Sequence, residues 1–442
     1  MEFASQTFLY YVLIVAYFIF ALFKPKWAVL ALPLFFPAYL LNFKIAGIPF
    51  TVIECLIYVT FSALVIHLIL NKFFIQWSIF CDKIWLPIAL VLFASIISAL
   101  IVPKEMFLID GKTLFESQKI AFGILKGWIV APLLMFSLFA FFLREEKDFR
   151  QLLNFYTLSC MPLALWALYQ VITRHYITDD ARASGPFISA NYLALYLTPA
   201  VFYTFTRLKD FAFDAFMAFI ALSLALLFTK SYAAIMAVII AVICYLSLRY
   251  RLFSRKRLYF GIIAFSLAVI LIVIFLDPVK WQTFTVITER TSSAVRLEVY
   301  QIAMRLIAEH PFLGLGLGQF PVFYQLEAPR ILGHAPYEWN MLHPHNLFLA
   351  FWLNLGLIGL AAFLWIIVLC IRKIWPLVKT FHKHTLDSFV QIKVIAFFML
   401  FIIIFHGFFD TPFFKNDLAL LFWLIVAIVL LPLSSRSNAK NI

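Results

Sequence analysis

The sequence predicts an all-α polytopic membrane protein, and this prediction rests on three observations. Hydrophobic residues make up 64% of the 442 positions and charged residues only 13%, so that the mean hydropathy is +0.98. Apolar segments of roughly 16 to 27 residues recur along the whole chain and are long enough to cross a bilayer as helices. The remaining charges gather between these segments. A single soluble core could not bury this much apolar surface, which excludes a soluble globular protein.

Thirteen segments are candidates for membrane-spanning helices. The segment 27–43 is the weakest of them, because it is short and contains Pro33 and Pro37, and proline interrupts helices. We therefore expect twelve or thirteen transmembrane helices in a single integral membrane domain, residues 1–442, with the N-terminus outside if there are thirteen. The thirteen segments are 7–23, 27–43, 50–71, 84–103, 120–143, 151–172, 190–206, 211–228, 231–248, 258–276, 346–371, 389–409 and 418–434.

Neither the N-terminus nor the cysteines indicate processing or a metal site. The first residues lack a basic region and a small-residue cleavage site, so we expect the first helix to remain in the protein. The cysteines show no C-x-x-C spacing and are scattered through or beside the apolar segments. We expect no disulfide framework and no zinc site from them. They are Cys55, Cys81, Cys160, Cys244 and Cys370.

Charge predicts which loops face the cytoplasm. One set of alternating loops holds 20 Lys and Arg against 7 Asp and Glu, whereas the rest of the chain holds 15 of each kind. The positive-inside rule places that set in the cytoplasm, so the net charge of +13 requires no nucleic-acid partner. The densest cluster, RYRLFSRKR at 249–257, is a topology anchor with membrane lipid as an additional partner. The loops are 24–26, 72–83, 144–150, 207–214, 249–257, 372–388 and the tail after 434.

The longest segment outside the membrane covers about residues 277–345, and the charge pattern places it on the outer face. Loops held by a rigid scaffold are where sites are commonly built, so we expect this loop to carry part of an active site. Apolar residues recur at helical spacing up to Pro311 and predict an amphipathic helix over 292–310. Arg296 falls in its first turn, where a cation opposes the helix dipole, which suggests another task for this residue. Arg305 and Glu309 are expected to pair on the solvent side.

The stretch G-L-G-L-G follows this helix. A dinucleotide-binding motif needs G-x-G-x-x-G between a strand and a helix, so these glycines do not predict one. We expect Gly314, Gly316 and Gly318 to let the backbone turn and approach the membrane surface.

Three motifs occur together in this chain: R-x-x-x-Y starting at Arg296, EHPFLGLGLGQF at 309–320 and HNLFLAFWLNLGLIGL at 345–360. Together they resemble the superfamily of O-antigen ligases and O-antigen polymerases. Three further stretches agree with the resemblance, which extends over about residues 120–434. They are RASGPFISANYLA at 182–194, TKSYAA at 229–234 and HGFFDTPFFKNDLALLFW at 406–423.

The resemblance implies a glycosyltransferase of the C-type helical fold, acting at the outer face of the bacterial cytoplasmic membrane. Such enzymes move a glycan from an undecaprenyl diphosphate carrier to an acceptor hydroxyl and invert the anomeric centre without a metal or another cofactor. The acceptor is a glycolipid, lipid A–core, for ligases and the next glycan repeat for polymerases. This sequence leaves the sugar, the linkage and the oligomeric state open.

The residues agree with a metal-independent mechanism, in which cations stabilise the departing diphosphate. Bidentate guanidinium groups suit phosphate oxygens. By its match to the family motif, Arg296 is the expected diphosphate-binding residue, with a surface arginine as the alternative. Arg182, Arg290 and Lys230 are further candidates, although the family often has S-R-G where this chain has Lys230-Ser231-Tyr232. The outer acids are dispersed without a D-x-D motif: Asp179, Asp180, Asp277, Glu289, Glu298, Asp410 and Asp417.

The acceptor hydroxyl needs a general base, for which imidazole is the usual group. Pro344 suits the first turn of a helix, so His345 is expected in that turn, where the helix dipole keeps its ring neutral. His345 is also the histidine followed by Asn346 in the family pattern, and we predict it as the base, with Asn346 binding substrate. His343 is expected on the loop side. The alternative is a polar helix start, in which both histidines bond to the backbone.

Two weaker sites complete the prediction. Lys126 lies inside an apolar span, where it contacts either the phosphate of the carrier lipid or a structural partner. His406 and Asp410 are spaced i,i+4 at an outer helix end. Asp410 either orients a histidine or binds sugar hydroxyls, or the pair caps the helix.

Two other classes of function, a transporter and a membrane scaffold, make predictions that differ from those of an enzyme. A transporter or flippase commonly shows internal repeats and midplane charges, whereas this chain shows no clear repeat and concentrates its polar residues in one outer loop. A membrane scaffold would predict that substitution of Arg296 and His345 has no effect. The sequence therefore favours an O-antigen ligase-like enzyme, with a polymerase of the same superfamily as the nearest alternative.

Overall fold

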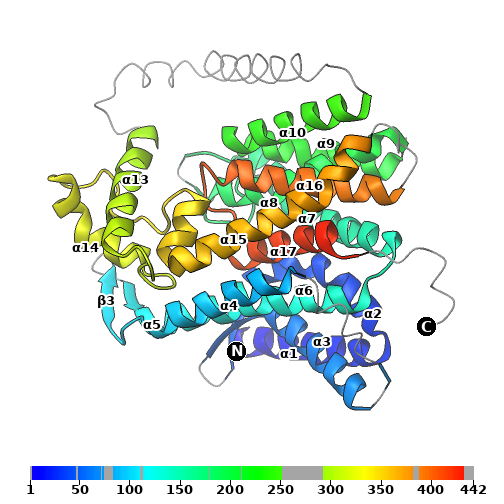
Figure 1. The fold of residues 1–442 in the computed structure, drawn as a ribbon, viewed down its shortest axis with the longest axis horizontal. Helices are drawn as coiled ribbons and strands as arrows, with labels where there is room; N and C mark the ends of the chain where they lie inside the picture. Colours follow the sequence, from blue (N-terminus) through cyan, green and yellow to red (C-terminus); the bar gives the residue numbers. More distant parts are fainter. Residues whose placement is uncertain are drawn as a thin grey trace.

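The fold was analysed in a computed structural model of the chain. It describes residues 2–45, 48–70, 72–73, 83–109, 113–178, 180–210, 212–250, 292–381 and 388–432. Long helices lie side by side and form the body of the molecule, while α13, α14 and strand β3 project at one end (Figure 1). The prediction of an all-α polytopic membrane protein is confirmed.

Twelve of the thirteen predicted spans coincide with helices. The remaining span, 258–276, lies outside the described residues. The helices of these spans are α1 (Glu2–Phe23), α2 (Pro25–Ala31) with η1 (Leu32–Leu40), α3 (Val52–Ile69), α4 (Trp85–Leu100), α5 (Ser117–Ile124) with η3 (Leu125–Val130) and α6 (Ala131–Phe142), α7 (Glu146–Thr173), α8 (Ala190–Arg207), α9 (Phe213–Phe228), α10 (Tyr232–Tyr250), α15 (Leu347–Thr380), α16 (Ser388–His406) and α17 (Asn416–Leu430).

Six helical segments of the described chain are long and apolar enough to cross a membrane. They are Val52–Ile69, Ser117–Phe142, Glu146–Thr173, Tyr232–Tyr250, Leu347–Thr380 and Ser388–His406. Five shorter apolar segments accompany them. Helix α17 is almost completely buried, and α8 is buried along most of its length. These two helices therefore lie in the interior of the bundle, where protein replaces lipid as their surroundings.

Short elements appear that the sequence did not predict. The weak span 27–43 is a short α-helix followed by a 3-10 helix with Pro37 inside it, because proline cannot donate the backbone hydrogen bond of a continuous helix. Two antiparallel hairpins lie in loops, one directly after this span and the other between α4 and α5. They pair β1 (Asn42–Ile45) with β2 (Ile48–Thr51) and β3 (Met106–Ile109) with β4 (Thr113–Glu116).

Contacts between loops group them as the charge pattern predicts. Lys26 lies 2.8 Å from Asp148, which joins two of the predicted cytoplasmic loops. Lys209 likewise donates to Gln391, at 2.5 Å, between the loop after α8 and the start of α16. The loops predicted to face outward meet at the other end of the bundle, as the candidate site shows.

The predicted outer loop contains the amphipathic helix α13 (Ser292–Glu309) and a second helix, α14 (Phe320–Leu332). Val299, Ile302 and Leu306 are completely buried and form a small separate core with α14, as their spacing predicts. The expected pair of Arg305 and Glu309 is present on the exposed side, at 3.0 Å. Residues 277–291 of this loop lie outside the described part of the chain.

The G-L-G-L-G stretch anchors this outer unit in a break of α15. Gly356 has φ +66° inside the helix, and a Cβ there would lie 2.0 Å from the carbonyl oxygen of Phe312. Gly314 has φ +70°, and a Cβ would lie 2.5 Å from the carbonyl oxygen of Leu353. Only glycine permits this conformation with so close an approach of two backbones. The glycines thus let the backbone turn, as expected, but it turns onto α15.

Candidate active site

The turn His343-Pro344-His345-Asn346 leads into α15 and differs from the prediction. Asn346 is the N-cap, and its Oδ1 accepts hydrogen bonds from the N–H groups of Phe348 and Leu349, at 3.0 and 3.1 Å. The prediction that His345 lies in the first helical turn is therefore wrong. Asparagine is a better N-cap than the residues before it, and the helix starts after it.

His345 instead precedes the cap and adopts a left-handed conformation, with φ +48°. Such a conformation is costly for a residue with a Cβ and persists where the surroundings hold it. Two contacts do so: the carbonyl oxygen of His345 accepts from the hydroxyl of Tyr300, at 3.0 Å, and the N–H of Leu347 donates to the carbonyl oxygen of Gly407, at 2.7 Å. The result is a ring that turns away from α15 and towards the loop between α16 and α17.

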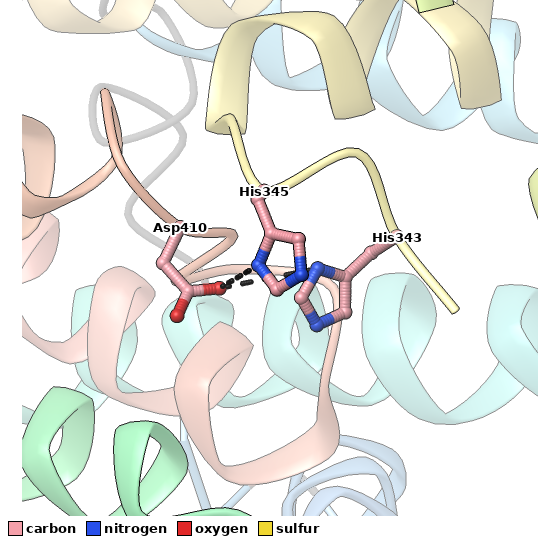
Figure 2. A group of neighbouring side chains, drawn as sticks. All are labelled: His343, His345 and Asp410. Atoms are coloured by element: carbon pink, nitrogen blue, oxygen red, sulfur yellow. Dashed lines mark ion pairs between the residues drawn. The ribbon is translucent and has the colours of Figure 1, made fainter. Parts of the chain in front are cut away.

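That loop carries Asp410, whose side chain faces both imidazoles (Figure 2). Its Oδ1 lies 3.5 Å from Nδ1 of His345 and 3.9 Å from Nδ1 of His343. Asp410 is 2% exposed, and its Oδ1 also accepts from the backbone N–H of Thr411, at 2.8 Å. Burial raises the pKa of Asp410, but the contact with His345 and the nearby imidazoles outweigh it and hold the pKa below its ordinary value. The carboxylate is therefore ionised at neutral pH.

The two nitrogens of His345 differ in their surroundings. Nδ1 faces Asp410, whereas Nε2 forms no hydrogen bond with any residue that the structure describes. The side chain keeps 22% of its exposure. A carboxylate beside Nδ1 favours the tautomer with the proton on that nitrogen, which leaves Nε2 as the acceptor. The arrangement can take a proton from a hydroxyl group.

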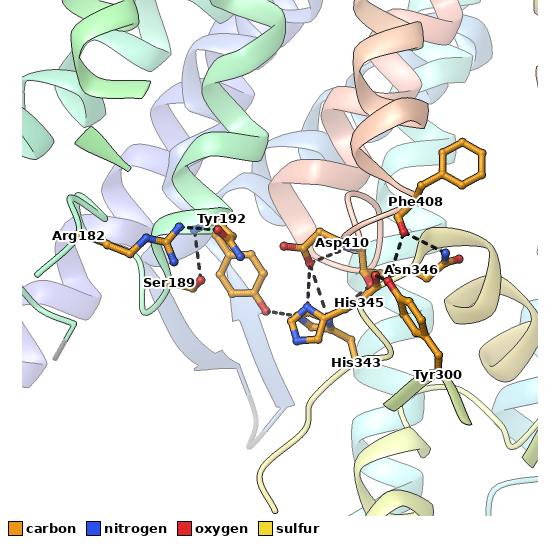
Figure 3. Close-up of polar contacts among 11 residues, drawn as sticks. Arg182, Ser189, Tyr192, Tyr300, His343, His345, Asn346, Phe408 and Asp410 are labelled. Carbon is orange, nitrogen blue, oxygen red and sulfur yellow. Dashed lines mark hydrogen bonds and ion pairs between the residues drawn. The ribbon is translucent and has the colours of Figure 1, made fainter. Parts of the chain in front are cut away.

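His343 is engaged on both nitrogens. Its Nε2 lies 3.2 Å from the hydroxyl of Tyr192 on α8, and its Nδ1 lies 3.5 Å from Oγ1 of Thr411 (Figure 3). Its ring meets that of His345 edge to face, with centroids 4.5 Å apart. Burial lowers the pKa of His343 to about 4, and the nearby His345 acts in the same direction. His343 is thus a neutral, fully bonded neighbour of the predicted base.

Helix α13 brings Arg296 to the same place. Tyr300 binds the carbonyl oxygens of His345 and Phe408, at 3.0 and 3.3 Å, and so docks α13 on the site. Arg296 precedes Tyr300 by four residues and lies on the same face of the helix. It is half-buried, and its charge acts on His343 and Tyr300. The structure therefore brings the two residues predicted as catalytic together.

Arg182 reaches the junction of α9 and α10, next to Lys230 in the chain. The guanidinium of Arg182 donates to the carbonyl oxygen of Thr229 and to Oδ1 of Asn191, both at 2.7 Å, and lies 3.3 Å from Asp180. Lys230 is exposed, with φ +50°. Arg182 lies beyond Tyr192 as seen from His343 (Figure 3), so it flanks the imidazoles on the side opposite Tyr300.

Three further residues were predicted to bind substrate: Asn346, Lys126 and Arg290. Asn346 uses its side chain as the N-cap and donates to the carbonyl oxygen of Phe408, at 3.2 Å, so its amide serves the fold in this structure. Lys126 forms an ion pair with Glu54 and donates to the carbonyl oxygen of Pro49, at 2.9 Å. Arg290 lies outside the described residues.

Residues 217–364 match the family model described as O-antigen ligase. This segment, about a third of the chain, is similar to the O-antigen ligase family. No curated protein shows significant similarity to the chain. The predicted recognition is confirmed, and the family supports a glycosyltransferase of the O-antigen ligase or polymerase type that acts on lipid-linked glycans in a membrane.

The match to the O-antigen ligase family includes Arg296, His343 and His345 but excludes Asp410 and Arg182. The fold supplies these two from outside the matched segment. Sequence analysis did not single out Tyr192, although it lies in the quoted SANYLA stretch, nor Tyr300 beyond its place in the R-x-x-x-Y motif. Sequence analysis also left open which histidine Asp410 faces, and in the structure the imidazole of His345 lies closer to Asp410 than that of His343 does.

His343, His345 and Asp410 also meet a geometric requirement for a metal site. One ligand atom from each lies within 4.8 Å of the others. Two imidazoles and a carboxylate are ligands that zinc and other transition metals accept. These three side chains could therefore hold a divalent cation.

Proposed function

We propose that the protein is an inverting, metal-independent glycosyltransferase that moves a glycan from undecaprenyl diphosphate to an acceptor hydroxyl, with lipid A–core as the acceptor, as in O-antigen ligases. The proposal places the site on the periplasmic face of the bacterial inner membrane. The observation that carries it is the pair of Asp410 and His345, which lies near Arg296. Nε2 of His345 has no partner among the described residues.

In the proposed reaction, Nε2 of His345 takes the proton of the acceptor hydroxyl while that oxygen attacks the anomeric carbon. The bond between the anomeric carbon and the diphosphate oxygen breaks, its electron pair stays on the diphosphate, and the anomeric centre is inverted. Asp410 stabilises the imidazolium that forms. Arg296 stabilises the charge on the diphosphate, and Arg182 and Lys230 are proposed to bind the same group from the opposite side.

The test is transfer by purified protein in detergent or nanodiscs. The donor is a glycan on undecaprenyl diphosphate, and lipid A–core and a second lipid-linked glycan repeat are offered in separate reactions. Product on lipid A–core supports the ligase, and a lengthened glycan supports the polymerase. Failure of both reactions with folded protein refutes the proposed activity, and carrier movement across vesicles without transfer would indicate a flippase.

The ligand geometry of His343, His345 and Asp410 favours a second version, in which a divalent cation supplies the Lewis acid. Metal analysis of the purified protein separates the two versions. The metal-independent version requires full activity after chelation and dialysis. Activity that is lost on chelation and restored by one divalent metal would establish the other.

A further inference from the structure

Two buried lysines lie at opposite ends of α17 and are held in different ways. Lys393 on α16 is 2% exposed and donates to the carbonyl oxygens of Val429 and Leu431, at 3.1 and 2.5 Å. The last carbonyls of a helix lack partners within it, so Lys393 satisfies the end of α17. This is a structural use of a buried ammonium group.

The ammonium group of Lys415, at the other end, forms no hydrogen bond within the described part of the chain. Its ammonium faces three aromatic rings, those of Tyr39, Phe187 and Tyr192, at 4.7, 4.2 and 4.3 Å from their centroids. The nearest carboxylate is Asp417, at 3.5 Å. The side chain is 13% exposed, and burial lowers the pKa of Lys415. Ring faces thus replace most of the water around this cation.

The three rings come from segments that also carry or support site residues. Phe187 follows Arg182 by five residues in one loop, and Tyr192 places its hydroxyl 3.2 Å from Nε2 of His343. Lys415 itself belongs to the loop that carries Asp410. Tyr39 stacks on Phe187, with centroids 6.2 Å apart. One ammonium group therefore contacts the supports of Arg182 and His343 from the loop of Asp410.

The cost of burying the ammonium group of Lys415 suggests that its charge has a role in the structure. Burying an ammonium group costs several kcal/mol, and here three ring faces and the buried carboxylate of Asp417 take the place of water around the charge. A cation over a ring also has a geometric effect that an apolar side chain lacks, because it favours the face of the ring over the edge. Lys415 can thus fix the orientation of rings that would otherwise rotate.

We propose that Lys415 is a positioning residue of the site, which holds the ring of Tyr192 so that its hydroxyl meets His343 beside His345. This inference rests on the proposed function, because its effect is on the rate of glycan transfer. Lys415 touches neither the donor nor the acceptor in this proposal. It acts through Tyr192.

The test is a double-mutant cycle with Lys415→Met and Tyr192→Phe, in the full-length protein with the glycan-transfer assay. Each single change should lower kcat about tenfold, roughly 1.4 kcal/mol, with KM for the donor changed less than about twofold. If Lys415 acts through Tyr192, the double variant should be no slower than the single variants. Additive losses would overturn the proposal.

Lys393→Met is the matched control, since it removes the buried ammonium group at the opposite end of α17. It should lower the unfolding temperature and leave kcat of the folded fraction unchanged. If Lys415→Met behaves in the same way, Lys415 is structural and the proposal is wrong. If Lys415→Met cannot be isolated folded, Tyr192→Phe keeps the inference testable, because wild-type kcat in that variant also overturns it. An inactive wild-type protein refutes the proposed function instead.

Discussion

Two polar clusters of this protein differ in how their charges are paired. Lys126 and Glu54 form an ion pair between α3 and η3, and Asn416 donates to Glu54 and to Thr51, at 2.7 and 3.3 Å. Lys126 also lies over the ring of Phe50, at 3.8 Å from its centroid. In this cluster each charge faces an opposite charge.

The cluster of Asp410 is arranged otherwise. One carboxylate faces two imidazoles, and Nε2 of His345 is without a partner among the residues that the structure describes. The side chain of His345 keeps 22% of its exposure, so this nitrogen can reach a molecule outside the protein. The comparison teaches that the first cluster closes the bundle, whereas the second retains bonding capacity for another molecule.

The largest expected effect comes from removing the imidazole of His345. His345→Ala should lower kcat about a thousandfold, because general-base catalysis contributes roughly 10²- to 10⁴-fold. The measurement is glycan transfer by protein whose folding is checked by thermal unfolding. His334→Ala, which changes an exposed histidine of the outer loop, should retain full activity. A near wild-type rate in His345→Ala would remove His345 from the role of base.

The second prediction concerns the closed cluster. Lys126→Met leaves Glu54 buried without its cation, which should cost about 3–5 kcal/mol of stability while kcat of the folded protein stays unchanged. Adding Glu54→Gln should restore much of the loss, because the unpaired charge disappears. Thermal unfolding and transfer assays measure the two quantities. The reverse result, intact stability with a large loss of kcat, would assign Lys126 to the carrier phosphate and break the comparison.

The third prediction concerns the cation beside the open cluster. Arg296→Ala should lower kcat/KM about a hundredfold, or about 2.7 kcal/mol, because the departing diphosphate loses a fixed partner. Arg296→Lys should recover little, since an ammonium group cannot bind two phosphate oxygens in the planar manner of a guanidinium group. Arg305→Ala on the exposed side of α13 is the control, with an expected rate near wild type. Full recovery by lysine would mean that charge alone is required.

Sequence reasoning located most of the fold because membrane helices follow from local hydropathy. The spans, the helix of residues 292–309 and its buried face depend on periodic patterns within one segment. The break of α15 at Gly356 was missed, because it depends on a backbone contact with Phe312, 44 positions earlier in the chain. The NLGLIG stretch contains the glycine, but only the fold reveals what approaches it.

The candidate site was predictable residue by residue but not as an arrangement. His345, Arg296 and Asp410 came from motifs, whereas their meeting depends on Tyr300 docking α13 and on the loop after α16. The predicted position of His345 in the first helical turn was wrong, because Pro344 and Asn346 both suit a helix start. The helix begins after Asn346, whose side chain caps it. Tyr192 and Lys415 have no motif of their own that local pattern analysis could detect.

The smallest predicted effect tests the buried histidine of the open cluster through pH. The pKa of His343 is about 4 in the folded protein and about 6.5 in the unfolded chain, so the unfolded chain binds more protons between these values. Stability should therefore fall by about 2 kcal/mol as the pH falls from 7 to 5. Thermal unfolding of the wild type and of His343→Asn across this range measures it. The difference between them should shrink as the pH falls, because the asparagine side chain of the variant does not titrate, whereas parallel curves would mean that His343 is accessible to protons in the folded protein.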